Sequence, residues 1–343
     1  MSRTMKAVRV HAHGGPEVLV HEEVARPEPG PGDVLIRVHA ACLNPPDWYA
    51  RSGFSNIPEA LRPAIALPFT PGSDVSGVVE ALGEGVTDWR VGDEVFGLVR
   101  FPDLNNGGRG YAEYTTSPAA HLARKPAGID HVHAAAVPMA GLTAWQYLFV
   151  LGHEMKEPQG FASLLQKQPW IPAPLGPGRV ALVNGAAGGV GHFAAQLAKS
   201  TGARVIGVAS GRHEGFLREL GVDEVIDYTK TAAEEVVRDV DLVIDTVGGP
   251  DGHRFLRTVK RGGMICPVFL GEYHRDRAAD LGIRVQSGQV WSDGRHMTEL
   301  ARRLEAGTLR VGIDSVFPLA EASKAHVRAE RGHIQGKIVL TVD

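Results

Sequence analysis

The sequence predicts an α/β protein in which a β-rich unit precedes a doubly wound domain with a parallel sheet. Short strand patterns, separated by glycine and proline, fill roughly the first 125 residues. From Ala134 onward, helical patterns alternate with short apolar strands, as they do in βαβ units. Within this second part, residues 180–199 read as a strand, a glycine-rich turn and a helix, which is the arrangement of a dinucleotide site.

The composition is that of an ordinary globular protein with room for about two domains. The chain has 343 residues, 43% hydrophobic and 22% charged, with a net charge of −3. This charge offers no basic field for nucleic acid or for an anionic membrane. Cys42 and Cys266 cannot build a disulfide framework, and neither a signal-peptide core nor a spanning apolar run is visible. We therefore expect a cytoplasmic protein that binds neither nucleic acid nor membrane.

The β-rich unit is predicted from short strands at close spacing, punctuated by Gly and Pro. Strands are expected at residues 6–11, 18–24, 34–40, 75–80, 91–97 and 111–115. The closing segment, residues 336–342, is again strand-like and is expected to rejoin this unit. The first domain is therefore predicted over residues 1–128, completed by about 318–343.

The doubly wound domain is predicted over residues 129–317. Helices are expected at residues 134–151, 214–220, 232–238 and 297–305, and strands at 180–183, 204–208, 225–226, 241–245, 263–268 and 283–286. A proline-rich insertion, residues 152–178, interrupts the pattern just ahead of the strand at 180–183. Long loops often, but not always, carry function. Two interpretations of this insertion therefore remain open: a surface loop without a chemical role, and a lid or dimer contact.

The glycine turn indicates a nucleotide site because missing Cβ atoms let backbone N–H groups approach a pyrophosphate at a helix N-terminus. Gly188, Gly189 and Gly191 lie between strand and helix, with Ala187 and Val190 among them. Ala186 stands where the G-x-G-x-x-G pattern has its first glycine. The alternative is a glycine-rich turn that binds nothing, but the strand before it and the helix after it favour a dinucleotide.

The end of the second strand of this domain favours NADPH over NADH. NAD enzymes usually carry an acidic residue here to hold the ribose 2′-hydroxyl. This chain has Ser210 instead, and Arg212 follows as a cation able to bind a 2′-phosphate. The alternative is that Arg212 is only a solvated loop charge.

Several segments, in order, resemble one known family. They are Asn44 to Gly53, Pro71 to Gly77, Gly83 to Val86, Val91 to Val95, Ala134 to Trp145, the glycine turn and Gly336 to Leu340. Over nearly its whole length the chain resembles the zinc-independent quinone oxidoreductases (zeta-crystallin-like) of the medium-chain dehydrogenase/reductase superfamily. The resemblance implies a GroES-like β-rich catalytic domain, a Rossmann cofactor domain, an active site in the cleft between them, and commonly a homodimer.

The same resemblance bears on zinc. Zinc-dependent relatives carry a cysteine where Asn44 stands and a His-Glu pair where Ser73 and Asp74 stand. Neither an asparagine nor a serine is a competent zinc ligand in such a site. Cys42 is expected to be a small buried hydrophobe. We therefore expect no metal.

Site residues follow by resemblance. Asn44 is expected beside the nicotinamide ribose and the substrate, and Tyr49 as a hydrogen-bond or proton donor or else as a pocket wall. Asp47 and Arg51 are expected to form an ion pair that holds their loop. Further cofactor contacts are expected at Thr143, Tyr228, Val247, Val268 and Lys337. The alternatives are a self-bonded helix hydroxyl for Thr143, a packing role for Tyr228 and a solvent-facing side chain for Lys337.

The expected function is an NADPH-dependent, zinc-independent oxidoreductase that transfers hydride to a quinone or to an α,β-unsaturated carbonyl. Without a Lewis acid, a conjugated acceptor is favoured because it spreads the arriving charge over several atoms. One alternative is an enoyl-thioester reductase, although the sequence lacks a local Lys/Arg cluster for a phosphopantetheine arm. Another is a non-catalytic NADPH-binding or RNA-binding protein, and the acidic balance speaks against RNA.

Overall fold

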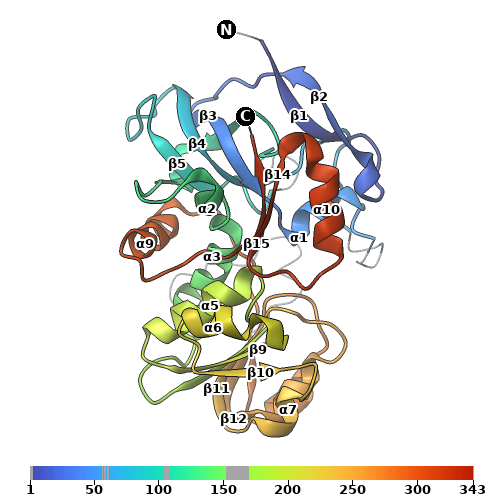
Figure 1. Ribbon diagram of the computed structural model, residues 1–343, viewed down its shortest axis with the longest axis vertical. Helices are drawn as coiled ribbons and strands as arrows, with labels where there is room; N and C mark the ends of the chain where they lie inside the picture. Colours follow the sequence, from blue (N-terminus) through green and yellow to red (C-terminus); the bar gives the residue numbers. More distant parts are fainter. Residues whose placement is uncertain are drawn as a thin grey trace. The chain divides into compact units, whose positions relative to one another are not determined.

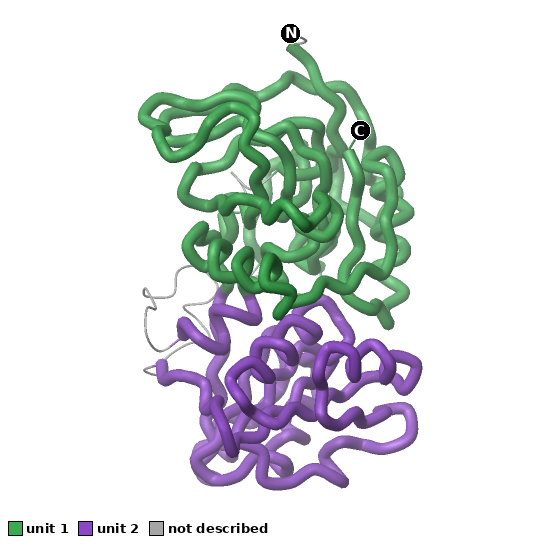
Figure 2. Tube along the Cα trace, turned by 60° about the vertical axis from the view of Figure 1, so that its left-hand side comes forward, with its two compact units in different colours: residues 1–142, 290–343 green, residues 143–289 purple. Residues whose placement is uncertain are grey.

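The computed structural model describes residues 3–55, 57, 59, 62–103, 109–151 and 170–342. The chain divides into two units, coloured separately in Figure 2. Unit 1 comprises Met1–Leu142 and Val290–Asp343, and unit 2 comprises Thr143–Gln289. The chain therefore builds most of unit 1, then unit 2, and returns to complete unit 1.

Unit 1 contains a largely antiparallel sheet with β3 and β4 near its middle (Figure 1). In the described part of the chain the strand order is β14-β15-β3-β4-β5-β7, with β6 also paired to β3. The strands are β3 (Asp33–Cys42), β4 (Asp74–Leu82), β5 (Glu94–Leu98), β6 (Tyr114–Pro118), β7 (Leu122–Arg124), β14 (Ile313–Pro318) and β15 (Lys337–Thr341). A separate antiparallel pair consists of β1 (Thr4–Val10) and β2 (Leu19–Ala25). Alternate residues of β3, including Val34, Ile36 and Val38, enter the core of this unit.

The closing strand confirms one expectation of the sequence. β15 pairs antiparallel with β3, so that Val339 lies opposite Cys42. Both residues are fully buried. The C-terminal segment therefore completes the first unit and brings Lys337 to the end of β3.

The helices of unit 1 are α1 (Pro45–Arg51), α2 (His131–Ala135), α9 (Gly294–Glu305) and α10 (Ala322–Glu330), with 3-10 turns η1 (Pro16–Val18), η3 (Ala119–His121) and η7 (Leu319–Glu321). α10 packs on β14, β15 and η1, and it lies beside β14 in Figure 1. Neither α1 nor α10 was expected from the sequence. Both matter below, because their side chains meet.

The unit boundaries differ from the expected ones, since residues 129–142 and 290–317 belong to unit 1. α9 explains the second segment. Its buried residues Met297, Leu300 and Leu304 follow helical spacing, and the helix packs on β7 and η3. Gly294 allows this approach, because a Cβ there would lie 2.5 Å from the Leu122 carbonyl oxygen.

Unit 2 is the expected doubly wound domain. Among the described residues its parallel sheet has the order β10-β9-β8-β11-β12-β13. The strands are β8 (Val180–Asn184), β9 (Arg204–Ala209), β10 (Glu224–Asp227), β11 (Val240–Asp245), β12 (Val259–Pro267) and β13 (Arg284–Val285). Strand order reverses at β8 and β11. In such sheets ligands bind outside the carboxyl ends of the strands at this reversal.

Helices cover both faces of this sheet (Figure 1). Right-handed crossovers place α5 (Gly189–Ser200) and α6 (Glu214–Glu219) on one face and α7 (Ala233–Val236) on the other. The remaining segments are α8 (Arg275–Asp280), η5 (Gly211–His213) and η6 (Gly252–Arg257). The long helix expected at 134–151 is divided, because α2 ends before Pro138, where α3 (Pro138–Trp145) begins. A π-helical turn, Gln146–Val150, follows α3.

Most of the proline-rich insertion, residues 152–169, lies outside the described residues, so its role stays a prediction. The end of the segment is attached to unit 2. Ile171 donates its N–H to Gln286 Oε1 at 3.0 Å and accepts from Gln286 Nε2 at 2.8 Å. Across the described ranges, none of the helices is long and apolar enough to cross a membrane.

Candidate active site

In unit 1, α1 begins directly after β3 with Asn44 as the residue before its first turn. Pro45 and Pro46 suit the first helical positions, where no backbone N–H is needed. Asp47 caps this end, accepting the Asn44 N–H at 2.8 Å and the Gly72 N–H at 3.0 Å. Burial raises the pKa of Asp47 to about 6, against the opposing effect of these N–H bonds.

The Asn44 side chain is buried and held at both ends. Its Nδ2 donates to Asp74 Oδ2 at 2.8 Å, and its Oδ1 accepts from Lys337 Nζ at 2.5 Å. A longer contact of 3.4 Å joins Nδ2 to the Cys42 carbonyl oxygen. The structure thus brings Asn44 and Lys337, two expected site residues, into direct contact.

Asp74, at the start of β4, was not among the expected site residues. Its second oxygen accepts the Met139 N–H, from the start of α3, at 2.8 Å. The carboxylate is fully buried, and burial raises its pKa to about 7 despite the nearby Lys337 ammonium. The available signal was an acidic residue at the start of a strand that is mostly buried, since a buried carboxylate needs partners.

Lys337 is 5% exposed, so the solvent-facing alternative is wrong. Its ammonium also donates to the Leu43 carbonyl oxygen at 2.9 Å. Cys42 lies next to this group and is fully buried, as expected. Burial raises the pKa of its thiol to about 12, which keeps it protonated and unreactive at neutral pH.

The expected ion pair between Asp47 and Arg51 is wrong. Arg51 instead donates to Glu330 Oε1 and to His326 Nδ1, both on α10. Because Nδ1 accepts, the neutral ring carries its proton on Nε2, which lies 3.3 Å from the Tyr111 hydroxyl. Tyr111 in turn donates to Asp47 Oδ2 at 3.4 Å.

The direction of these hydrogen bonds, from Arg51 through His326 and Tyr111 to Asp47, requires a neutral His326 ring. Burial, together with the Arg51 charge, lowers the pKa of His326 to about 3, so the ring is neutral. The chain of hydrogen bonds ties α1 to α10 and leaves Asp47 as the final acceptor. Arg51 faces α10, while the Asp47 carboxylate accepts the N–H groups of Asn44 and Gly72.

Tyr49 lies on α1 and is half-buried, with its ring edge-on to Trp48 at 5.8 Å between centroids. Burial raises the pKa of its phenol, so the hydroxyl stays protonated and able to donate a hydrogen bond. Both the donor role and the pocket-wall role remain open at this position.

The residues around Asn44 do not fit a zinc ion. The Asn44 amide is already bonded to Asp74 and Lys337, and the Lys337 ammonium would repel a second cation. Across the residues described by the structure, no group of three or more His, Cys, Asp or Glu side chains could hold a metal.

In unit 2 the glycine turn follows β8, and its residues Ala187 to Gly191 lead into α5. The N–H groups of the first helical turn have no partner within the helix, and Gly188, the preceding residue, has no side chain to cap them. A Cβ at Gly191 would lie 2.1 Å from the Gly185 carbonyl oxygen, so glycine is required for this close packing. These features fit a pyrophosphate group.

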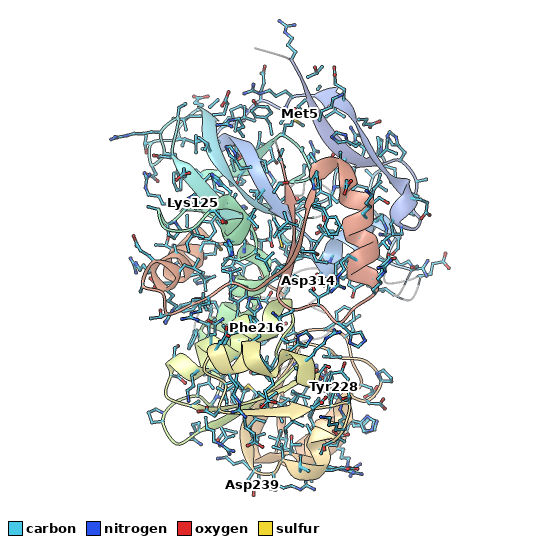
Figure 3. The ribbon with its side chains drawn as sticks, in the orientation of Figure 1. Met5, Lys125, Phe216, Tyr228, Asp239 and Asp314 are labelled. Carbon is cyan, nitrogen blue, oxygen red and sulfur yellow. The ribbon has the colours of Figure 1, made fainter. Side chains whose placement is uncertain are left out.

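The next strands end beside this turn and bring Ser210, Arg212 and Tyr228 to one edge. A Cβ at Gly211 would lie 2.5 Å from Asp227 Oδ2, so the ends of β9 and β10 are adjacent. Asp227 itself accepts from the Thr229 N–H and hydroxyl. Arg212 is exposed, and Tyr228, labelled in Figure 3, is 47% exposed.

Asp245 is a second buried carboxylate that sequence reasoning missed. At the end of β11 it accepts from Asn184 Nδ2 at 2.8 Å and Tyr273 Oη at 2.9 Å. It also accepts the N–H groups of Val247 and Gly248, each at 3.1 Å. The loop bearing Val247 is therefore fixed beside the glycine turn.

The remaining expected contacts lie in unit 2. Val247 is 55% exposed, and a Cβ at Gly185 would come within 2.9 Å of it. Val268, just after β12, donates its N–H to the Asp245 carbonyl oxygen at 2.9 Å. Thr143 is buried in α3. The cofactor role of each stays a prediction.

Comparisons with known proteins find relatives over almost the whole chain. The family model "Alcohol dehydrogenase GroES-like domain" matches residues 30–127, and the model "Zinc-binding dehydrogenase" matches residues 220–340. The mitochondrial NAD(P)H oxidoreductase RTN4IP1 of Mus musculus is 31% identical, covering 91% of this chain and 82% of that protein. The quinone oxidoreductase of Sus scrofa is 31% identical, covering 98% of each.

Solved structures agree with this likeness. The quinone oxidoreductase from Coxiella burnetii has a TM-score of 0.82 and 32% identity, over 99% of this chain and 100% of that one. An NAD-dependent alcohol dehydrogenase has a TM-score of 0.84 and 30% identity, over 99% and 100%. A mycobacterial protein, Rv1454c, complexed with NADPH has a TM-score of 0.80 and 28% identity, over 98% and 99%.

Proposed function

Because this chain belongs to the quinone oxidoreductase (zeta-crystallin-like) branch of the medium-chain dehydrogenase/reductase superfamily, we propose that it reduces a quinone or an α,β-unsaturated carbonyl with NADPH and without zinc. Family membership makes it an NAD(P)H-dependent oxidoreductase. The choice of NADPH, the enone substrate and the independence from zinc are our proposals.

The observation that carries the proposal is the uncapped glycine turn at the start of α5. Residues Gly189 to Gly191, in the first turn of a 12-residue helix, present backbone N–H groups at its positive end, while the Gly188 N–H donates to the Gly185 carbonyl oxygen within the turn. Asp245 holds the neighbouring loop with its Val247 and Gly248 N–H groups turned inward. This chain would therefore bind the cofactor pyrophosphate through backbone, with Val247 alongside.

The edge formed by Ser210, Arg212 and Tyr228 supports NADPH. Ser210 does not repel a 2′-phosphate, and the exposed Arg212 guanidinium can bind one in bidentate fashion. Asp227, the acidic residue at this edge, is held by the Thr229 hydroxyl and N–H and by the nearby Lys230. Among related structures, one is of an NAD-dependent alcohol dehydrogenase and another contains NADPH, so the likeness does not decide between the two cofactors. Our choice of NADPH therefore depends on the residues of this chain.

The donor chemistry around Asn44 supports independence from zinc, although one matching family model is described as zinc-binding. Asn44 and Ser73 stand where zinc-dependent relatives have a cysteine and a histidine, and Lys337 places a positive charge in the same cluster. Without a Lewis acid, an acceptor that delocalises charge is the more reactive substrate. A bound NADPH supplies the hydride, and the half-buried Tyr49 phenol can donate a hydrogen bond to the acceptor oxygen.

The proposal is tested by following NADPH absorbance with a naphthoquinone, an enone, an enoyl thioester and an aldehyde. We expect oxidation with the first two acceptors. Turnover confined to the thioester would favour the enoyl-thioester alternative. If the protein binds NADPH but oxidises it with none of the four, the chain is not the proposed reductase.

Tyr49→Phe distinguishes the two roles left open for this residue. If the phenol donates to the acceptor, kcat should fall about tenfold or more while the KM for NADPH stays close to wild type. Steady-state kinetics with the best acceptor measures both. An unchanged kcat would leave Tyr49 as a wall of the pocket.

The cytoplasmic location stays a prediction, because relatives include mitochondrial and chloroplastic proteins. The homodimer is likewise a proposal that rests on the family resemblance.

A further inference from the structure

The Asn44 side chain has partners beyond those that its position before α1 suggests. An asparagine before a helix normally accepts a backbone N–H of the first turn. Here the Asn44 and Asp47 side chains lie as in a capping box, with Asp47 accepting the Asn44 N–H, and the Asn44 amide also bonds Asp74 and Lys337. The carboxamide is therefore held by more contacts than the start of α1 requires.

The two partners of the carboxamide have opposite polarity, so only one orientation is compatible with them. Nδ2 faces Asp74, which in its ionised form can only accept, and Oδ1 faces an ammonium that can only donate. A flip of the amide would set donor against donor at Lys337 and acceptor against acceptor at Asp74. In the low dielectric of a buried site, each reversed contact would be costly.

Both partners are themselves anchored. Asp74, on β4, also accepts the Met139 N–H from α3, and Lys337, on β15, also donates to the Leu43 carbonyl oxygen. All three side chains are at most 5% exposed. Burying an ammonium and a carboxylate costs free energy that a pair of apolar side chains would not cost.

We propose that Asp74 and Lys337 are positioning residues for the reductase, clamping the Asn44 carboxamide so that a fixed set of its atoms serves the bound nicotinamide nucleotide. This clamp, formed by Asp74, Asn44 and Lys337, rests on the proposed function. Nδ2 is bonded to Asp74 and lies near the Cys42 carbonyl. The acceptor Oδ1, held in place by the Lys337 ammonium, is the atom of the amide suited to a ribose hydroxyl.

The clamp itself is tested without cofactor, by the unfolding equilibrium of Asp74→Asn, Lys337→Met and Lys337→Arg. Asn at position 74 keeps only one acceptor oxygen, so its N–H₂ group faces either Asn44 Nδ2 or the Met139 N–H, donor against donor. We expect Asp74→Asn and Lys337→Met each to raise the unfolding constant about tenfold or more, and their combination by less than the product. Lys337→Arg, which keeps a donating cation, should retain most of the stability. Additive losses, with Arg no better than Met, would overturn the clamp.

The role in the reaction is tested by the Kd of NADPH, measured by calorimetry, and by kcat with the best acceptor. We expect Asp74→Asn and Lys337→Met to weaken NADPH binding about tenfold, with Lys337→Arg near wild type. Asp241→Asn is the matched control. Asp241 is also buried and paired with lysine, Lys260, but it lies at the opposite end of β11 from Asp245. It should lose stability and keep the wild-type Kd.

The proposed reductase activity and the proposed clamp can fail independently of each other. If wild type binds NADPH but reduces no acceptor, the proposed reductase fails, while the Kd values still test the clamp. If Asp74→Asn and Lys337→Met lose stability but keep both wild-type Kd and kcat, the three residues only support the fold and the positioning role is wrong. Should Asp74→Asn fail to fold, the contrast between Lys337→Met and Lys337→Arg tests the same claim.

Discussion

The buried carboxylates of Asp47 and Asp74 show how a residue's surroundings set its chemistry. Each carries a raised pKa because burial outweighs its N–H partners, and Lys337 partly offsets this for both. His326 is the opposite case, since burial lowers the pKa of its ring to about 3. These shifts have consequences for how stability depends on pH.

The pKa of Asp74, about 7 in the folded chain against 3.8 for the free side chain, predicts a loss of stability as pH rises through 7. The folded state binds the proton more tightly, so the stabilisation is complete at low pH and disappears above the folded pKa. His326 and His131, with lowered pKa values, act mainly below pH ~6.5. Between pH 6 and 8, the melting temperature should therefore fall less in Asp74→Asn than in wild type. Parallel pH profiles would contradict the assignment.

Arg212 carries the prediction about cofactor choice. If its guanidinium binds the 2′-phosphate, Arg212→Ala should raise the Kd of NADPH by about tenfold or more and leave that of NADH almost unchanged. The neighbouring exposed Arg218, which contacts Glu214 and the Asp223 carbonyl, offers a matched control. Titration of both nucleotides against each variant measures the effect. Equal weakening of NADPH and NADH would remove Arg212 from the phosphate site.

At the scale of elements, sequence patterns predicted what is local. The strand, turn and helix over residues 180–199 were readable because β8 begins with a continuous apolar run and the apolar residues of α5 repeat at helical spacing. α10 was not expected, and α1 was not separated from its loop. The Asp74–Asn44–Lys337 clamp could not be predicted, since it joins positions 30 and 293 residues apart from Asn44 through sheet pairing.

Two glycines of the glycine turn allow the effect of a side chain on packing to be separated from its effect on nucleotide binding. A Cβ at Gly191 would lie 2.1 Å from the Gly185 carbonyl oxygen, whereas one at Gly188 would lie 3.3 Å from it. Gly191→Ala should therefore destabilise unit 2 as well as weaken NADPH. Gly188→Ala should keep a melting temperature within a few degrees of wild type while still impeding the nucleotide. Thermal melts and NADPH titrations measure the two. A Gly191→Ala protein as stable as Gly188→Ala would contradict the packing argument.

For the whole molecule, the sequence predicted the fold class and the order of its parts, and the structure confirms both. The division into units differs because α9 packs on β7 in unit 1, a contact that periodicity alone cannot reveal. The candidate site shows the same limit. Asn44, Lys337 and the glycine turn were expected from motifs, whereas Asp74 and Asp245 were recognised only from the groups they hold.

The central claim is that this chain reduces conjugated acceptors with NADPH and needs no metal. Its most direct test is the rate of NADPH oxidation with a naphthoquinone, measured before and after exhaustive treatment with a chelator. The account predicts acceptor-dependent oxidation at the same rate in both samples. A rate that disappears on chelation and returns with zinc, or NADPH binding without any oxidation, would contradict it.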